Sequence, residues 1–111
     1  MAERFGDIVV EIGKLRDYCL NEMHPRGRHK ARVFKSRLGL RAGDAELLRQ
    51  TLLAAAQSRQ DELRAADADE FGQRYLLDFP MTTATGSATI RSAWIVLAGQ
   101  DVLRLTSCYV L

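Results

Sequence analysis

The spacing of the apolar residues changes from a helical to an alternating pattern after Ser58, and this change constrains the fold more than any other feature. Before Ser58, apolar residues recur three or four positions apart, as on one face of a helix. After it, short segments alternate apolar and polar residues, as strands with one buried face do. This order predicts an α+β fold in which N-terminal helices pack on one face of a roughly four-stranded antiparallel sheet.

Two longer helices are expected in the N-terminal half. The first covers residues 28–38 and has Ala31, Phe34 and Leu38 on its buried side. Gly39 is its expected C-terminal stop, because glycine adopts the left-handed conformation that ends many helices.

The second helix is expected to begin after Asp44 as its N-cap and to continue to about residue 57. Residues 14–21 fit one or two further helical turns. The β-branched segment 8–12 suits an edge strand or the lead-in to a helix. The apolar stripe of the second helix is expected to consist of Leu47, Leu48, Thr51, Leu52 and Ala55.

The second half is expected to form four strands, over residues 62–67, 73–79, 88–97 and 102–110. Pro80 is expected to end the second of them. The third strand is predicted to place Ile90, Ser92, Trp94 and Val96 on one face and Thr89, Arg91, Ala93, Ile95 and Leu97 on the other. The whole chain, 1–111, is expected to form one domain with a helical part at about 14–58 and a sheet part at about 60–110.

The bulk composition is that of an ordinary globular domain, with 47% hydrophobic and 27% charged residues among 111. No apolar run approaches the roughly 20 residues that span a bilayer. The N-terminal residues mix acids into their apolar positions and lack the layout of a signal peptide. The expected location is therefore the cytoplasm, with no membrane partner.

A basic stretch, HPRGRHKARVFKSRLGLR, runs from His24 to Arg41 and contains both histidines of the chain. No acid lies between Glu22 and Asp44, so most of the positive excess of the chain is concentrated here. Such a local field with imidazoles inside it suits a polyanion site. The alternative is a solvated helix face. The residues expected to contact RNA or phosphate are Arg26, Arg28, His29, Arg32 and Lys35.

No motif in the chain indicates a metal or an organic cofactor, so none is expected. Cys19 and Cys108 lie far apart in the sequence and form no C-x-x-C pair. Both fall in apolar patterns, which predicts reduced, buried thiols that pack as small hydrophobic side chains.

Metal-independent RNA cleavage fits the remaining inventory of His, Lys, Arg and hydroxyl groups. Attack by the 2′-hydroxyl needs a base, an acid for the departing oxygen, and positive charge on the transition state. The 2′-hydroxyl also allows such a site to choose RNA over DNA.

Each candidate catalytic residue also has a structural alternative. His24 is either a general base or acid, or a group that orders its loop. Lys30 either holds a phosphate or stays in solvent. Arg91 lies in an apolar strand, where an unpaired charge is costly, so it either faces solvent or serves a site. Thr106 and Ser107 alternate along the last strand, so only one of them can point with Arg104 or Arg91 toward a given cleft.

Three segments, KLRDYCLNEMHPRGRHKARVF, IRSAW and RLTSCY, resemble an uncharacterised bacterial domain family. The family motif H-P-x-G-x-x-K-A corresponds to His24, Pro25, Gly27, Lys30 and Ala31, its R-x-x-W motif to Arg91 and Trp94, and its last-strand hydroxyl to Ser107, where most members have Thr. The family is similar to the C-terminal effector domains of bacterial polymorphic toxins, which are grouped with the barnase/EndoU/colicin/RelE-like ribonuclease fold. The resemblance implies N-terminal helices packed on a four-stranded antiparallel sheet.

The expected function is a metal-independent ribonuclease of the toxin-effector type, with RNA as substrate and an acidic immunity or antitoxin protein as partner. In this reading His24 is the general base or acid, Lys30 and Arg91 bind the scissile phosphate, and Ser107 or Thr106 donates a hydrogen bond to it. The alternative is a non-catalytic binding module, or an accessory or immunity-like protein, that uses the basic 24–41 face for RNA or an acidic protein.

Overall fold

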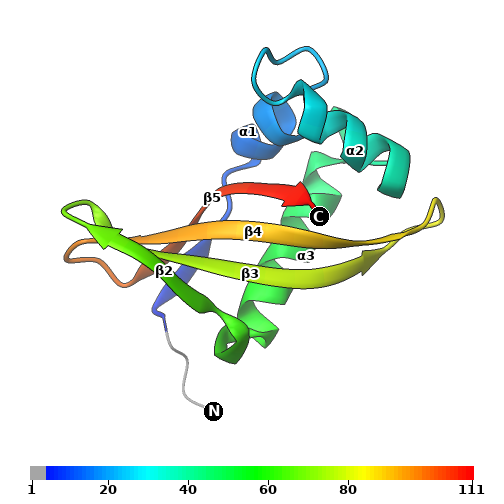
Figure 1. Ribbon diagram of the computed structural model, residues 1–111. Coiled ribbons are helices and arrows are strands. Elements are labelled where there is room, and N and C mark those ends of the chain that lie inside the picture. Colours follow the sequence, from blue (N-terminus) through cyan, green and yellow to red (C-terminus); the bar gives the residue numbers. More distant parts are fainter. Residues whose placement is uncertain (1–4) are drawn as a thin grey trace.

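The computed structural model describes residues 5–111, which form a five-stranded mixed sheet with helices against one face (Figure 1). The strands, in the spatial order β1-β5-β4-β3-β2, are β1 (Asp7–Val9), β5 (Val102–Val110), β4 (Ser87–Leu97), β3 (Gly72–Thr82) and β2 (Arg64–Asp69). The last four form an antiparallel meander, as expected from the sequence.

The α+β class is confirmed, but the expected number of about four antiparallel strands is corrected to five. The segment after the N-terminus supplies β1, which pairs in parallel with β5 through Asp7 and Val102. A parallel neighbour needs a long crossover, and the whole chain between the two strands provides it. The sheet therefore includes residues that lie before the helical part of the sequence.

The helical part consists of α1 (Ile12–Lys14), the π-helical turn η1 (Leu15–Cys19), α2 (Arg28–Leu38), η2 (Ala42–Asp44), α3 (Ala45–Ser58) and η3 (Gln60–Glu62). The predicted bounds of α2 are confirmed. Gly39 follows it with a positive φ of 68°, and its N–H donates to the Lys35 carbonyl. No helix of the described residues is long and apolar enough to cross a membrane.

Asp44 is the N-cap residue of α3, as predicted, but its side chain makes no cap bond to that helix; its carboxylate accepts the backbone N–H of Arg41 at 2.9 Å in the preceding turn. The predicted apolar stripe of α3 is wrong at one position. Leu47 is 53% exposed, whereas Ala56 is fully buried. The buried side of α3 is therefore turned away from Leu47, and its members are Ala45, Leu48, Leu52, Ala55 and Ala56.

Pro80 does not end β3, which continues to Thr82 with Pro80 opposite Thr89. The pairing of β2 with β3 reaches only to Leu76, where it meets Arg64. Beyond that point β3 is an edge strand, and an edge position tolerates a residue without a backbone N–H.

The two faces of the sheet differ in what covers them. On the helix face, Leu77, Ile90 and Trp94 are at most 1% exposed and pack with Leu48 and Leu52 of α3, which lies behind the sheet in Figure 1. On the other face, which we call the open face, the side chains of the same strands are partly buried or exposed, apart from the buried Ile95. The predicted division of β4 into two faces is confirmed.

Ser92 is the one buried polar residue among those described, and it joins two strands to the core tryptophan. Its hydroxyl donates to the Leu77 carbonyl at 2.8 Å and accepts the indole N–H of Trp94 at 2.8 Å. Each of these polar groups is buried, so each depends on the others for its hydrogen bond.

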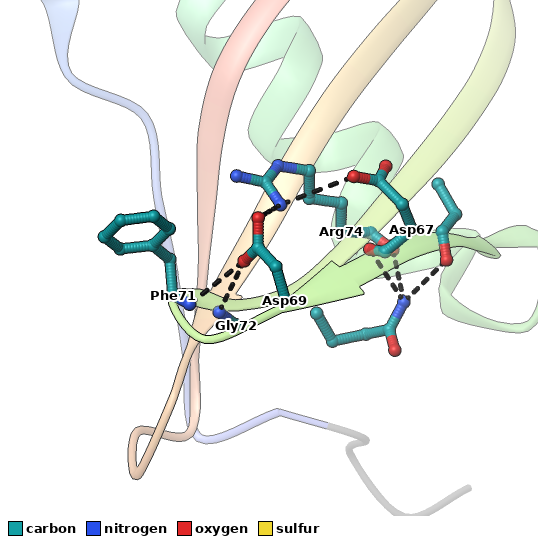
Figure 2. A network of polar contacts seen from close by, with 7 residues as sticks. Asp67, Asp69, Phe71, Gly72 and Arg74 are labelled. Carbon is teal, nitrogen blue, oxygen red and sulfur yellow. Dashed lines mark hydrogen bonds and ion pairs between the residues drawn. The ribbon is translucent and has the colours of Figure 1, made fainter.

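The β2–β3 hairpin is held by a second polar network, shown in Figure 2. One Asp69 oxygen accepts the backbone N–H groups of Phe71 and Gly72, and the other accepts Arg74 Nη1 at 2.8 Å. Asp67 also lies 3.5 Å from Arg74 Nη1. Asp67 and Asp69 therefore lie close together because both interact with Arg74, and Asp69 also stabilises the turn.

We expect Ser92→Ala to lower the free energy of unfolding by about 1–3 kcal/mol, because it leaves the Trp94 N–H buried without an acceptor. Ser87→Ala is the matched control, since Ser87 is exposed and its hydroxyl contacts only the exposed Thr82 hydroxyl among the described residues. The control should change stability by no more than about 0.5 kcal/mol. Equal urea midpoints for the two variants would contradict this role of Ser92.

Candidate active site

The loop between η1 and α2 is organised by His24. Its Nδ1 accepts the backbone N–H groups of Arg26 at 3.0 Å and Gly27 at 3.1 Å. The ring also packs edge-on against Tyr18, with 4.7 Å between ring centroids. Since Nδ1 is the acceptor, the proton of the neutral ring lies on Nε2. In this loop His24 therefore has the geometry of a cap, and its outer nitrogen is a hydrogen-bond donor.

Gly27 allows the loop to pack closely against η1. A Cβ at this position would lie 2.6 Å from the Tyr18 carbonyl oxygen, a distance that no side chain tolerates. Four residues later, Ala31 is 1% exposed at the start of α2. The segment from His24 to Ala31 therefore packs compactly against η1 and determines where α2 begins.

The N-terminal helical segment is also fixed to β5 directly. The Lys14 ammonium donates to the Leu105 carbonyl at 3.0 Å, just beyond the part of β5 that pairs with β1. Leu15 and Cys19 of η1 are at most 1% exposed in the shared core. The position of the loop relative to the sheet is thus set by both a hydrogen bond and apolar packing.

Lys30 lies over the sheet as a result of this packing. Its Nζ is 4.7 Å from the centre of the Tyr109 ring, a cation–π contact between α2 and β5. Tyr109 is directly opposite Arg91 of β4 in the strand register. The structure therefore brings together Lys30 and Arg91, which are far apart in the sequence, with Tyr109 between them.

Arg91 is paired rather than isolated. Its Nε and Nη2 donate to the two oxygens of Asp78 on β3, both at 2.8 Å, and Arg64 adds a bond of 3.1 Å to the same carboxylate. The bond with Arg91 is the main reason that the pKa of Asp78 is lowered. Asp78 in turn raises the pKa of Arg91, with a smaller contribution from Tyr109. The guanidinium is held in a fixed plane on the open face.

A β-bulge decides which hydroxyl of β5 shares this face. Trp94 is opposite Leu105 and Ala93 is opposite Ser107, so Thr106 is the extra residue. The Thr106 hydroxyl is exposed and donates to the Ala93 carbonyl at 3.0 Å. Ser107 lies two residues from Tyr109 and therefore shares its face, so the structure places Ser107, rather than Thr106, beside Arg91 and Tyr109.

The two thiols are buried next to this cluster, as the sequence predicts. Interaction with the Cys108 thiol lowers the pKa of Cys19 to about 7, against the opposing effect of burial. Ser107 and the positive charge of Lys30 add smaller effects in the same direction. The pKa of Cys108 is raised by Cys19 and by burial.

The rest of the basic stretch points away from the protein interior. Arg26, Arg28, His29 and Arg32 are exposed, and Lys35 makes a long contact of 3.5 Å with Glu22. These residues form a solvated positive surface on α2 and on the loop before it. Lys30 differs from them because it is partly buried against a strand.

This arrangement can bind an anion and can move a proton. Two cations flank a phenol, which both donates and accepts hydrogen bonds. Among residues 5–111, no three His, Cys, Asp or Glu side chains are grouped where they could hold a metal ion. Sequence reasoning missed Tyr109 and Asp78 as members of the cluster. Tyr109 could have been found from its position two residues after Ser107, on the same side of the predicted strand.

We expect His24→Ala to destabilise the protein by about 1–2 kcal/mol, because two backbone N–H groups lose their acceptor. His24→Asn should stay close to the wild type, since an asparagine side-chain oxygen accepts the same kind of N–H groups in a turn. Chemical denaturation of the three proteins tests this role. Equal destabilisation by Ala and Asn would argue against a cap.

Asp78 should contribute stability that depends on pH. Its pKa is lowered in the folded protein, so the contribution is present above the unfolded pKa of about 3.9 and is lost as the pH falls through the lower folded value. Asp78→Asn should cost about 1–2 kcal/mol at pH 7, and the difference from wild type should shrink below about pH 4. Unfolding curves from pH 2 to 7 measure this, with the exposed Asp61→Asn as control.

Comparison with known proteins places the whole site within one family domain. No curated protein matches the chain. One protein-family model matches residues 2–111, which include the His24 loop, Lys30 and all five strands, and its description is "Domain of unknown function (DUF6883)". The chain therefore belongs to this family of uncharacterised domains, DUF6883.

Proposed function

We propose that this protein is a metal-independent ribonuclease of the bacterial toxin-effector type, with its active site around Lys30, Tyr109 and Arg91. The observation that supports the proposal most is the cation–π contact of 4.7 Å that places Lys30 beside Tyr109, directly opposite Arg91 in the sheet. Lys30 lies in the first turn of α2, where helix N–H groups also favour a phosphate.

In the proposed reaction, the 2′-oxygen of the RNA attacks the adjacent phosphorus and the bond to the 5′-oxygen breaks. The products are a 2′,3′-cyclic phosphate and a free 5′-hydroxyl. Lys30 and the part of the Arg91 guanidinium not bound by Asp78 stabilise the charge that develops on the phosphate oxygens. Ser107 donates a hydrogen bond to the same group.

Tyr109 donates its phenol proton to the departing 5′-oxygen, with His24 as a supporting donor. Water accepts the proton of the 2′-hydroxyl, and the Tyr109 phenolate recovers a proton from solvent. The Tyr109 phenol can both donate and accept hydrogen bonds, and its contacts with Lys30 and Arg91 fix its orientation. The sequence suggested His24 as general base or acid. Because His24 Nδ1 already accepts two backbone N–H groups, the neutral ring offers only an Nε2 proton to a substrate.

The toxin assignment adds a partner. If the protein acts on cellular RNA, an acidic immunity or antitoxin protein is expected to cover the positive surface of Arg26, Arg28 and Arg32. Complementary charge would give fast association that weakens as salt increases.

A second candidate function is a binding module that uses the same cluster without chemistry. Two sets of hydrogen bonds favour it, because they occupy groups that catalysis would need. Arg91 donates two hydrogen bonds to Asp78, and His24 Nδ1 accepts the backbone N–H of Arg26. The RNA or acidic protein would then be held and released unchanged. An accessory or immunity-like protein would use the same positive surface.

RNA cleavage in the presence of EDTA tests the proposal. Purified protein should cut RNA but not DNA of the same sequence, and the products should carry cyclic phosphate ends. Lys30→Met should lower kcat/KM by about 100-fold or more, because it removes charge stabilisation of the transition state. Binding without any cleavage by wild-type protein would support the binding module instead.

Lys35→Met is the matched control, because it removes the same charge from the exposed side of the same helix. It should change kcat/KM only a few-fold, through weaker long-range attraction of the RNA. Equal losses for Lys30→Met and Lys35→Met would mean that the cluster with Tyr109 has no special part in the reaction.

A further inference from the structure

The open face carries four arginines, and one of them differs from the rest. Arg64 and Arg91 are paired with Asp78, and Arg74 is paired with Asp69 and Asp67. Arg104 of β5 has no ion pair within residues 5–111. Its charge is therefore available to a ligand.

The Nε atom of Arg104 is buried and has no hydrogen-bond partner within residues 5–111. The same holds for the Ser107 hydroxyl oxygen. Ser107 lies close enough to Cys19 to influence the thiol, but the contact lacks the geometry of a hydrogen bond. Buried donors without acceptors are rare and costly, so two of them on one strand call for an explanation.

The β-bulge makes these two residues neighbours. Arg104 is opposite Ile95 and Ser107 is opposite Ala93, and Ile95 and Ala93 are two positions apart on the open face of β4. Tyr109, opposite Arg91, follows in the same row. Arg104, Ser107 and Tyr109 therefore form a line along β5, in steps of about 7 Å where the strand is regular.

The β4 side chains opposite Arg104 and Ser107 are apolar. Ile95 is 9% exposed and Ala93 is partly buried, so neither offers an acceptor from its side chain. No group of residues 5–111 hydrogen-bonds to the Arg104 Nε or to the Ser107 hydroxyl in this strip. A phosphodiester supplies both the acceptor oxygens and the negative charge.

We propose that Arg104 forms a second phosphate subsite next to the Lys30–Tyr109–Arg91 cluster, so that a single RNA strand lies along β5 on the open face. This inference rests on the proposed ribonuclease function and adds the path of its substrate. One phosphate is held at Tyr109 and Arg91, and the next but one is held at Arg104, two steps of about 7 Å along the strand, with Ser107 between them. The step between rows is comparable to the spacing of successive phosphates in an extended strand.

The test uses a fluorescein-labelled octamer of 2′-O-methyl RNA, which cannot undergo 2′-hydroxyl attack, so binding is measured without cleavage. Arg104→Gln should raise the Kd by about tenfold, the usual effect of losing one charge-assisted contact. It should also reduce the slope of log Kd against log salt concentration by about the amount of one phosphate contact. Both effects should shrink for a dinucleotide with a single phosphate.

Arg59→Gln is the control, because it removes one partly exposed arginine charge just after α3, where Arg59 pairs with Glu62. Arg104→Lys keeps the charge but loses the planar donors, so it should fall between wild type and Arg104→Gln. If Arg104→Gln does not fold, the Kd of Arg104→Lys for the octamer tests the subsite instead.

The two proposals fail in different ways. If wild type binds and cleaves RNA but Arg104→Gln or Arg104→Lys binds the octamer like Arg59→Gln, the subsite is wrong and the ribonuclease proposal stands. If wild-type protein neither binds the octamer nor cleaves RNA, both are wrong. A tenfold loss for Arg104→Gln with an unchanged Kd for Arg59→Gln supports the subsite.

Discussion

The packing of η1 and the start of α2 along β5 is the constraint on which the candidate site depends. β1 covers only the first part of β5, from Val102 to Arg104, so the remaining edge needs another partner. The Lys14 ammonium donates a hydrogen bond to the Leu105 carbonyl, which β1 leaves free. Leu15 and Cys19 bury the adjoining apolar surface. An exposed strand edge is thereby covered by a helix, and the helix that follows is brought over the sheet.

The H-P-x-G-x-x-K-A segment is explained by this geometry without any catalytic role for most of its residues. His24 satisfies two backbone N–H groups, and Gly27 permits close contact with Tyr18. Ala31 fits the core at the start of α2. Together these contacts place Lys30 against Tyr109.

The charges of the chain divide into two groups with different physical settings. Those on the outer side of α2 are exposed, and solvent and salt screen them, so they act mainly at long range. Those on the open face are partly buried and lie in a fixed geometry set by the sheet register and by Asp78. The first group therefore acts through its long-range field, whereas the second presents its charges in a defined orientation.

The sequence by itself determined the α+β class, the bounds of α2 and β5, the two faces of β4 and the burial of both cysteines, because local periodicity and glycine carry these signals. It could not determine the parallel pairing of β1, the continuation of β3 through Pro80 or the bulge at Thr106, since each depends on what the neighbouring strand does. For the same reason it named Lys30, Arg91 and Ser107 but missed Tyr109 and Asp78. Residue types suggest chemistry, but only strand register and helix packing decide which side chains meet.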